Sequence, residues 1–307
     1  MSASPHILLL FLDGVGLGED DPEVNPFCTA ILPTLHQLSG GQRWLRTTGY
    51  QTSERAVLIP TDPRMGVSGR PQSGTGQAAI VTGRNIPQLV GEHYGPKPNE
   101  ATRALLTEDN VFKQVLAMGK TATLLEAYPP IWHTGIESGK HLPSSYQYAA
   151  QAAGLRFPTM QDLLNGDALS GDWTGEGWRA QLGFPEIPTL TPYEAGVRLV
   201  QLSRRVDFAF FPHWMTDVVG HRGSLADAVR LLEVFDGVMA GVMDTWQDDE
   251  GLVIITSDHG NIEEIGNRHH TMSDVPTVVI GSDRTRFAEG LHSLADIAPR
   301  IVEVLRK

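Results

Sequence analysis

The stretch "HILLLFLDGVGLG", residues 6–18, decides how the fold is read from the sequence. Apolar residues follow one another from Ile7 to Leu12, and the run stops at Asp13 and a glycine-rich turn. A strand that is covered on both faces has such a continuous apolar run, because neither face meets water. The stretch therefore predicts a buried strand that delivers a carboxylate at its end.

The same pattern recurs along the chain and alternates with helical patterns. Further strands are predicted at 121–127, 206–212, 251–256 and 275–281. Helices are predicted at 192–205, at 224–246 with Ser224 as its N-terminal cap, and at 293–307, which Pro299 should kink or divide. Strands that alternate with helices predict an α/β layered fold with a mostly parallel sheet.

Residues 89–190 differ from the rest, because they are rich in Pro, Gly and Trp and have weak periodicity. We interpret them as a small cap module inserted into a core domain made of residues 1–88 and 191–307. The alternative is a set of long loops on a single domain.

Composition excludes some partner classes. The net charge is −12, and the sequence contains no basic stripe, so we expect no nucleic-acid partner. The single cysteine, Cys28, excludes an internal disulfide and a cysteine-based metal cluster, which fits a cytoplasmic location. The run Ile7–Leu12 is too short for a signal peptide or a membrane span, so no membrane partner is expected. The oligomeric state stays open.

Acids and imidazoles follow several of the predicted strands. Because ligands of open α/β sheets bind at the carboxyl ends of the strands, these side chains are expected to converge. They are Asp13, Asp217 with His221, Asp258 with His259, and His269 with His270. Mixed carboxylate and imidazole ligands suit Mn²⁺ or Zn²⁺ better than Ca²⁺. The set exceeds the needs of one ion and predicts two, an arrangement that clamps phosphoryl groups.

Each element of this set has a simpler interpretation. Asp13 could cap a helix or hold the turn, and Asp217 with His221 could be a surface pair. Asp258 with His259 could form a buried turn, and the His269-His270 pair could be solvated. All of these would have to hold at once, each after an apolar run, so a shared site is the better hypothesis.

A candidate nucleophile lies in "GRPQSGTGQAAIVTGRN", residues 69–85, which is glycine-rich and then helix-like from Gly76. Ser73 lies where a loop enters that helix, and a helix N-terminus favours a phosphate. A seryl oxygen held by a divalent ion can lose its proton near neutral pH. Thr75 is the competing hydroxyl, and an ordinary serine cap is the structural alternative.

Five motifs occur in order along the chain: Asp13-Gly, Ser73-x-x-Gly, Asp217-x-x-Gly-His221, Ser-Asp258-His259-Gly-Asn and His270-Thr. This order resembles the alkaline phosphatase superfamily, and within it the branch of cofactor-independent phosphoglycerate mutase and phosphopentomutase. The resemblance covers roughly residues 5–88 and 195–307. It implies an alkaline-phosphatase-like three-layer sandwich.

The resemblance also implies residue roles. One metal ion would be held by Asp217, His221 and His270, and the other by Asp13, Asp258, His259 and the Ser73 oxygen. His270 is preferred to His269 because the family's His-Thr, followed five residues later by Pro, matches His270-Thr271 and Pro276. Ser73 would be the phosphorylated nucleophile. The implied reaction is in-line attack, a phosphoseryl intermediate, and return of the phosphoryl group to a substrate hydroxyl or to water.

The sequence departs from the mutases in two ways. Their nucleophile motif usually ends in His, whereas this chain has Gln77. The chain is also too short for their large, arginine-bearing insertion. The expected cap has few cationic residues, and they are scattered: Arg103, Arg156, Arg179, Lys97, Lys113, Lys120 and Lys140. We therefore predict a phosphomutase-type enzyme for a small phosphorylated metabolite, with phosphoglycerate disfavoured. The alternatives are a phosphatase or phosphodiesterase that uses the same site, and a non-catalytic, metal-stabilised binding module.

Overall fold

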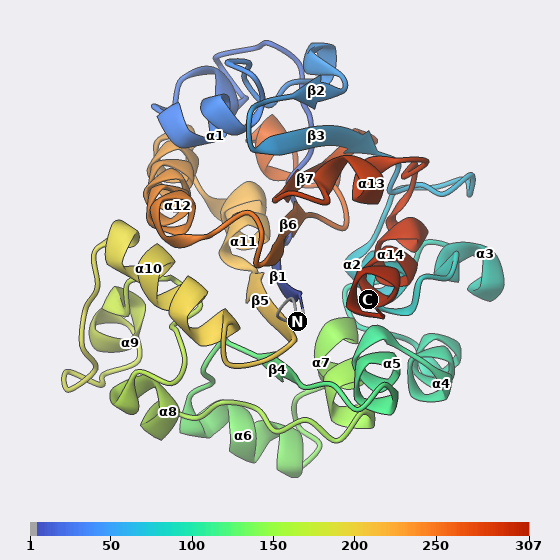
Figure 1. Ribbon diagram of the computed structural model, residues 1–307, viewed down its shortest axis with the longest axis vertical. Coiled ribbons are helices and arrows are strands. Elements are labelled where there is room, and N and C mark those ends of the chain that lie inside the picture. The colour runs from blue at the N-terminus through green and yellow to red at the C-terminus, as the bar shows by residue number, and fades with distance from the viewer. Residues whose placement is uncertain (1–4, 307) are drawn as a thin grey trace.

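The computed structural model describes residues 5–306 and contains one seven-stranded sheet with helices on both faces (Figure 1). The strand order across the sheet is β2-β3-β7-β6-β1-β5-β4. The strands are β1 (His6–Leu12), β2 (Gln51–Thr52), β3 (Ala56–Thr61), β4 (Ala122–Leu124), β5 (Phe208–His213), β6 (Gly251–Thr256) and β7 (Val275–Ile280).

The strand directions confirm an α/β fold with a mostly parallel sheet. β4, β5, β1 and β6 are parallel neighbours. β7 is antiparallel to both β6 and β3, so β3 runs in the same direction as the four parallel strands. Every strand predicted from the sequence lies in this sheet, whereas β2 and β3 extend it at one edge and were not predicted.

Helices fill the connections between the strands. Short 3₁₀ helices are η1 (Pro26–Cys28), η2 (Arg46–Thr48), η3 (Ile262–Glu264) and η4 (Leu294–Asp296). The α-helices are α1 (Pro33–Leu38), α2 (Ser73–Thr82), α3 (Ile86–Val90), α4 (Glu100–Glu108), α5 (Val111–Ala117), α6 (Pro130–Glu137), α7 (Ser145–Ala152), α8 (Met160–Asn165), α9 (Glu176–Ala180), α10 (Pro192–Ser203), α11 (Met215–Arg222), α12 (Leu225–Thr245), α13 (Arg284–Ala288) and α14 (Ile297–Leu305).

The ends of these helices follow from the sequence. Ser224 caps α12, since its side chain accepts a hydrogen bond from the backbone N–H of Asp227. The predicted helix 293–307 is divided into η4 and α14, and Pro299 lies in the first turn of α14. Proline is tolerated there because first-turn N–H groups have no partner within the helix.

Two hydrophobic cores lie on opposite faces of the sheet, because alternate residues of a strand point to opposite sides. Ile7, Leu9 and Phe11 of β1 pack in one core with α2, α5, α7 and α14. Leu8, Leu10 and Leu12 of the same strand pack in the other core with α1, α10 and α12. Figure 1 shows these two helix groups on either side of the sheet. The result is the three-layer sandwich expected from the resemblance.

Residues 89–190 contribute to the sandwich and also form a smaller unit. β4 is the edge strand of the sheet, and α4, α5 and α7 supply side chains to the first core. The segment after β4, which includes α8 and α9, forms a third, small core. This core consists of Ala127, Leu163, Ala168, Trp178 and Ile187. We call residues 125–190 the cover segment, because side chains from this range line the cavity described below.

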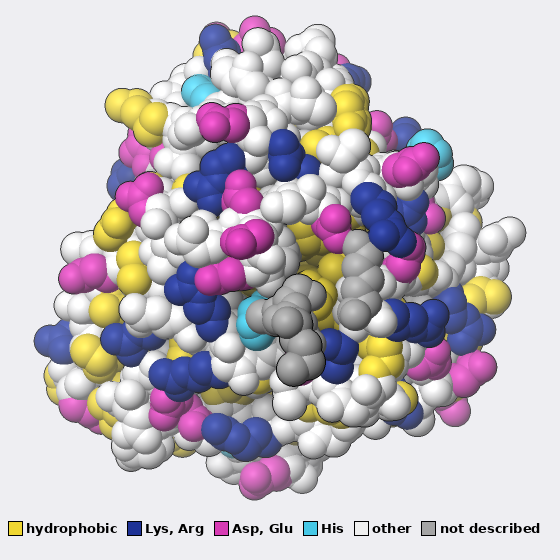
Figure 2. Space-filling model, in the orientation of Figure 1, with side chains coloured by type: hydrophobic (Ala, Val, Ile, Leu, Met, Phe, Trp, Pro, Cys, Tyr) yellow, Lys and Arg dark blue, Asp and Glu magenta, His cyan; other side chains and the backbone are white. Residues whose placement is uncertain are grey.

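The charged residues on the surface are mixed (Figure 2), as expected for a chain whose net charge is −12. On the face shown in Figure 2, Lys and Arg side chains are interspersed with Asp and Glu, and the described residues there form no continuous basic area. Within residues 5–306, none of the helices has the length and apolar character needed to cross a membrane.

Candidate metal centre

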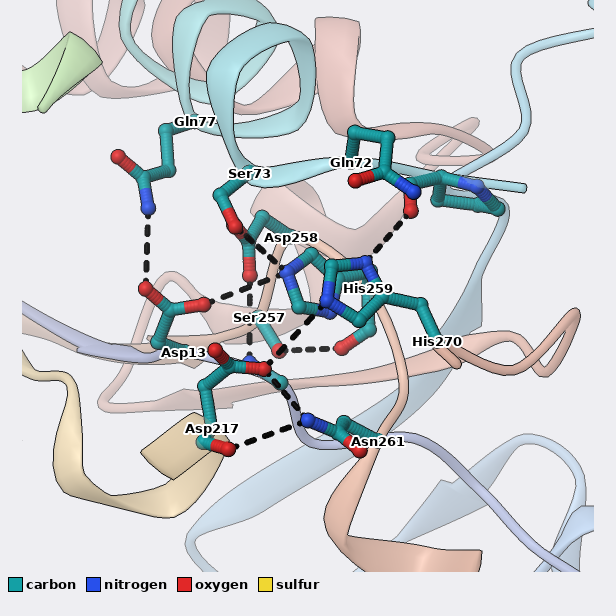
Figure 3. Close-up of polar contacts among 12 residues, drawn as sticks. Asp13, Gln72, Ser73, Gln77, Asp217, Ser257, Asp258, His259, Asn261 and His270 are labelled. Carbon is teal, nitrogen blue, oxygen red and sulfur yellow. Dashed lines mark hydrogen bonds and ion pairs between the residues drawn. The ribbon is translucent and has the colours of Figure 1, made fainter. Parts of the chain in front are cut away.

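Parallel neighbouring strands deliver the candidate ligands to one edge of the sheet. Asp13 follows β1, Asp258 and His259 follow β6, and Asp217 and His221 lie on α11, which comes directly after β5. β6, β1 and β5 are adjacent, so their carboxyl ends meet. Figure 3 shows side chains from these ends directed toward one another, beneath the start of α2.

The inner cluster consists of Ser73, Asp13, Asp258 and His259, and all four residues are buried. Nε2 of His259 lies 2.9 Å from the Ser73 Oγ, 3.3 Å from Asp13 Oδ1 and 3.5 Å from Asp258 Oδ2. Apart from these contacts with His259, the two carboxylate oxygens have no donor among the described residues. Buried carboxylates with so few donors are unfavourable unless a cation compensates them, so the inner cluster fits a metal ion.

The outer cluster consists of Asp217, His221 and His270. Asp217 Oδ1 lies 3.4 Å from Nε2 of His221 and 3.6 Å from Nε2 of His270, and the two imidazole nitrogens are 3.2 Å apart. Nδ1 of His270 lies 2.9 Å from the carbonyl oxygen of Pro71, which can only accept, so the ring proton is on Nδ1. Nε2 is then free to bind a metal, so the donor set fits a second ion.

The two clusters adjoin each other. The rings of His259 and His270 stack with their centroids 3.6 Å apart and an interplanar angle of 11°. Ligand atoms of Asp217, His259 and His270 also lie within 4.8 Å of one another. His269 is exposed and lies outside the clusters. The structure thus brings together the seven residues singled out from the sequence and separates His269 from them.

The charges of the inner cluster show a demand for positive charge. Burial raises the pKa of Asp13 and of Asp258, and the charge of a neighbouring carboxylate raises each further. Burial lowers the pKa of His259, but the negative charges of Asp258 and Asp13 have the larger effect and raise that pKa to about 10. Burial and the charge of His259 lower the pKa of His270 to about 4. Acids this close need a cation, which a proton or a metal ion can supply.

Further residues position the ligands, and sequence reasoning missed them. Gln77 Nε2 donates to Asp13 Oδ2 over 3.0 Å, and Asn261 Nδ2 donates to Asp217 Oδ1 over 2.6 Å. Ser257 Oγ accepts from the backbone N–H of Val15 and donates to the carbonyl oxygen of His259. Ser257 and Asn261 flank Asp258-His259 in the sequence, which is the signal that could have identified them. In the sequence, Gln77 is visible only as a departure from the nucleophile motif of the mutases.

α2 begins at Ser73, three residues earlier than the sequence predicted. A Cβ atom on Gly76 would lie 2.8 Å from the carbonyl oxygen of Asp258, so a glycine at this position lets α2 approach the end of β6. The Thr75 hydroxyl instead accepts a hydrogen bond from the backbone N–H of Tyr94, at 3.2 Å. The structure therefore places the Ser73 hydroxyl in the inner cluster and gives the Thr75 hydroxyl another partner.

A cavity of about 490 Å³ opens beside the two clusters. Its size falls within the range of roughly 300–1,000 Å³ that is usual for small-molecule sites. Ser73, Asp13, Gln77 and Asp217 line it next to the clusters. Its other walls come from the cover segment and from residues around α11, among them Glu126, Tyr128, Trp132, Asp172, Trp178, Trp214 and Val218.

Sequence comparisons point to one family. Residues 196–306 match the Metalloenzyme superfamily. The 2,3-bisphosphoglycerate-independent phosphoglycerate mutase of Methylobacillus flagellatus is 32% identical over 127 residues, which cover 38% of this chain and 25% of that protein. The enzyme of the same name from Pseudomonas putida is 31% identical with the same coverage. The chain thus spans about a quarter of the length of these relatives.

Solved structures share the fold over nearly the whole chain. The PH0037 protein of Pyrococcus horikoshii matches 100% of this chain and 98% of its own, with a TM-score of 0.57 and 17% identity. The alkaline phosphatase of the Antarctic bacterium TAB5 matches 99% of both chains, with a TM-score of 0.53 and 13% identity. The family implies divalent metal ions. Residues 196–306 of the chain thus match the Metalloenzyme superfamily, part of the chain resembles the 2,3-bisphosphoglycerate-independent phosphoglycerate mutases, and its fold resembles that of an alkaline phosphatase.

Proposed function

We propose that this chain transfers the phosphoryl group of a small phosphorylated metabolite through Ser73, with the help of two divalent ions, Mn²⁺ or Zn²⁺. The observation that carries the proposal is the position of the Ser73 hydroxyl. It is buried 2.9 Å from His259 Nε2, which is also the donor closest to the buried oxygens Asp13 Oδ1 and Asp258 Oδ2. A serine cap on a surface helix would not be buried among acids.

The donor sets define which residues would hold each ion. The inner ion would be held by Asp13, Asp258, His259 and the Ser73 oxygen, and the outer ion by Asp217, His221 and His270. When bound, such ions lower the pKa of a hydroxyl ligand and neutralise charge on phosphoryl oxygens. The mixture of carboxylate and imidazole favours Mn²⁺ or Zn²⁺ over Ca²⁺.

The protein's own groups prepare the phosphoryl transfer. Ser73 is the first residue of α2, where the helix dipole favours an anionic phosphoryl group. Its oxygen attacks phosphorus in line with the ester oxygen. The Ser73 O–P bond forms, the ester P–O bond breaks, and the alcohol leaves with a proton. Gln77, one turn further along α2, holds Asp13 in place through its 3.0 Å hydrogen bond.

The acceptor of the phosphoryl group decides between a mutase and a hydrolase. The mutase outcome follows from the resemblance, and we propose that residues 89–190 supply the substrate contacts. The cavity lining favours the hydrolytic alternative, as phosphatase or phosphodiesterase. Among the described residues that line the cavity, the Lys and Arg side chains are represented by Lys97 alone. A mutase needs such groups to retain an anionic substrate while it turns, whereas a hydrolase only needs access for water.

Product analysis by ³¹P NMR tests the proposal. The protein is loaded with Mn²⁺ or Zn²⁺ and given 3-phosphoglycerate, a pentose phosphate, p-nitrophenyl phosphate or bis(p-nitrophenyl) phosphate. An isomerised ester identifies a mutase, inorganic phosphate a phosphatase, and p-nitrophenyl phosphate from the diester a phosphodiesterase. Each activity should disappear in Ser73→Ala. If no ester is consumed with either metal, the proposal is wrong and the binding-module alternative returns.

A further inference from the structure

We propose that the cavity holds a second recognition site, the Glu126 subsite, which binds a positively charged amino group on the alcohol part of the substrate. The subsite consists of Glu126, Tyr128, Trp132 and Trp214. This inference rests on the proposed function, since it names the class of ester that would reach Ser73: a phosphate ester of an amino alcohol with a primary to quaternary ammonium group.

Glu126 is an acid with an unused acceptor in the wall of the cavity. It is 3% exposed and follows β4. Its Oε1 accepts a hydrogen bond from Trp214 Nε1 over 2.7 Å. Its Oε2 meets no donor at hydrogen-bond geometry within residues 5–306, although the neighbouring Tyr128 hydroxyl lies close enough to lower the pKa of Glu126. A buried carboxylate in this state is matched by a ligand that brings a donor or a positive charge.

Aromatic side chains line the cavity together with this carboxylate. Trp132 and Tyr128 stack with their centroids 4.1 Å apart, and Phe157 contacts the edge of the pair. Trp178 lines the same cavity, and Trp214 is 43% exposed beside it. Indole and phenol faces attract organic cations, and a carboxylate among such rings adds a direct charge partner. The combination suits an ammonium group better than an anion.

The remaining charges of the cavity agree with this assignment. Asp172 is already engaged, because it accepts hydrogen bonds from the backbone N–H groups of Gly175 and Gly177. Lys97 belongs to the metal end, where the charge of Asp13 acts on it. A substrate carboxylate, as in phosphoglycerate, would therefore meet Glu126 with no arginine among the described lining residues to hold it.

The ionisation of Glu126 supports the geometry. Burial raises the pKa of Glu126 to about 7, while Tyr128 and Trp214 lower it by less. The carboxylate thus lacks a compensating charge in the protein alone, and a bound cation would supply one.

The subsite and the metal centre face the same space. Ser73, Asp13 and Asp217 line the cavity together with Glu126, and Trp214 lies three residues before Asp217 in the chain. One small molecule can therefore place its phosphoryl group at Ser73 and its amino group at Glu126. The cavity volume of about 490 Å³ leaves room for both ends.

A matched pair of probes tests the subsite without metal or catalysis. Choline and 3,3-dimethylbutan-1-ol have the same shape, but only choline is charged. Binding to the metal-free protein is followed by calorimetry and by tryptophan fluorescence. We expect choline to bind roughly tenfold more tightly than its neutral isostere. Equal binding of the two probes, or no binding of choline up to its solubility limit, overturns the proposal.

Glu126→Gln tests which residue makes the distinction. It keeps the size of the side chain and should reduce the choline preference to within about twofold, while Glu176→Gln, an exposed acid on α9, should keep it. Thermal unfolding shows that both variants are folded. If the wild-type preference exists and Glu126→Gln retains it, the assignment of Glu126 is wrong.

Turnover by the metal-loaded protein separates this inference from the proposed function. The kcat/KM for consumption of phosphocholine is compared with that for 3,3-dimethylbutyl phosphate by ³¹P NMR. A ratio of roughly ten in the wild type that falls toward one in Glu126→Gln supports the subsite. Consumption of both esters with a ratio near one overturns the subsite and leaves the proposed function intact. If p-nitrophenyl phosphate and both esters stay intact, the proposed function fails, and the binding of choline by the metal-free protein decides the subsite alone.

Discussion

The Ser73 hydroxyl lies 2.9 Å from Nε2 of His259, although the two residues are 186 positions apart in the sequence. The contact exists because α2 and the end of β6 approach closely at Gly76, where a larger side chain would meet the Asp258 backbone. The hydroxyl therefore belongs to a buried group of acids and imidazoles. This is why we assign it a chemical role rather than a capping role.

Asp258→Ala should remove the inner metal ion. Asp258 is fully buried, and its Oδ2 makes no hydrogen bond with a described residue, so a metal ion is its natural partner. We expect plasma emission spectroscopy to show the loss of one of the two proposed ions, and a fall in phosphoryl transfer of roughly 100-fold or more. The control is Asp249→Ala, which removes an exposed acid. Full metal content and activity in Asp258→Ala would contradict the assignment.

The two adjacent histidines offer a matched test of the outer cluster. His270 is buried with its Nε2 3.6 Å from Asp217 Oδ1, whereas His269 is exposed. His270→Ala should weaken binding of the outer ion by at least roughly tenfold, and His269→Ala should leave it unchanged. Equilibrium dialysis against graded metal concentrations measures both. Equal effects of the two substitutions would refute our choice of His270.

Most of the sheet could be predicted from the sequence, because β1, β5 and β6 are continuous apolar runs that need cover on both faces. β3 was not predicted, although its residues Ala56–Ile59 form a short apolar run that is buried in the structure. The apolar pattern also does not reveal the direction of a strand. β7 has the same pattern as its neighbours and yet runs antiparallel to both. Residues 89–190 looked irregular, although α4, α5 and α7 pack into the main core, because their short helices carry little periodic signal.

The site was predictable where residues follow a strand, and unpredictable where only tertiary contacts reveal a role. Asp13 and Asp258 are located by the strands before them. Asp217 and His221 have the spacing of an ordinary surface pair on a helix, and only the 3.2 Å approach of His270 shows a cluster. Gln77 stands at the end of the nucleophile motif, where the mutases usually have His, and Glu126 lies in no motif. Their contacts with Asp13 and Trp214 exist only in the folded chain.

Metal removal should destabilise the protein markedly. Without ions, the carboxylates of Asp13, Asp217 and Asp258 face one another, and burial of two of them disfavours their charge. A ligand present at 1,000 times its Kd stabilises the folded state by about 4 kcal/mol. We expect scanning calorimetry to show a large drop in Tm after chelation, with recovery after addition of Mn²⁺ or Zn²⁺. Asp258→Ala should show a smaller drop. Equal Tm values for metal-loaded and chelated wild type would contradict metal binding at this site.

Glu126 should make stability depend on pH. Burial raises the pKa of Glu126 to about 7 in the folded protein, above its ordinary value of 4.5. The folded state thus binds the proton more tightly, so the stabilisation is complete below about pH 4.5 and is lost as the pH rises through 7. Relative to Glu126→Gln, the wild type should lose about 3 kcal/mol of unfolding free energy across this range. Urea titrations at several pH values measure the difference, and Glu176→Gln is the control. A difference that stays constant with pH would contradict the burial argument.

The central claim is that Ser73 carries the phosphoryl group, and trapping the phosphoenzyme tests it most directly. The metal-loaded protein is mixed with p-nitrophenyl phosphate, quenched in acid within a turnover, digested and analysed by mass spectrometry. We predict phosphate on Ser73 in the wild type, and no phosphopeptide in a Ser73→Ala protein that still holds both ions. Turnover with no covalent phosphate, or phosphate on Thr75 in either protein, would contradict the account.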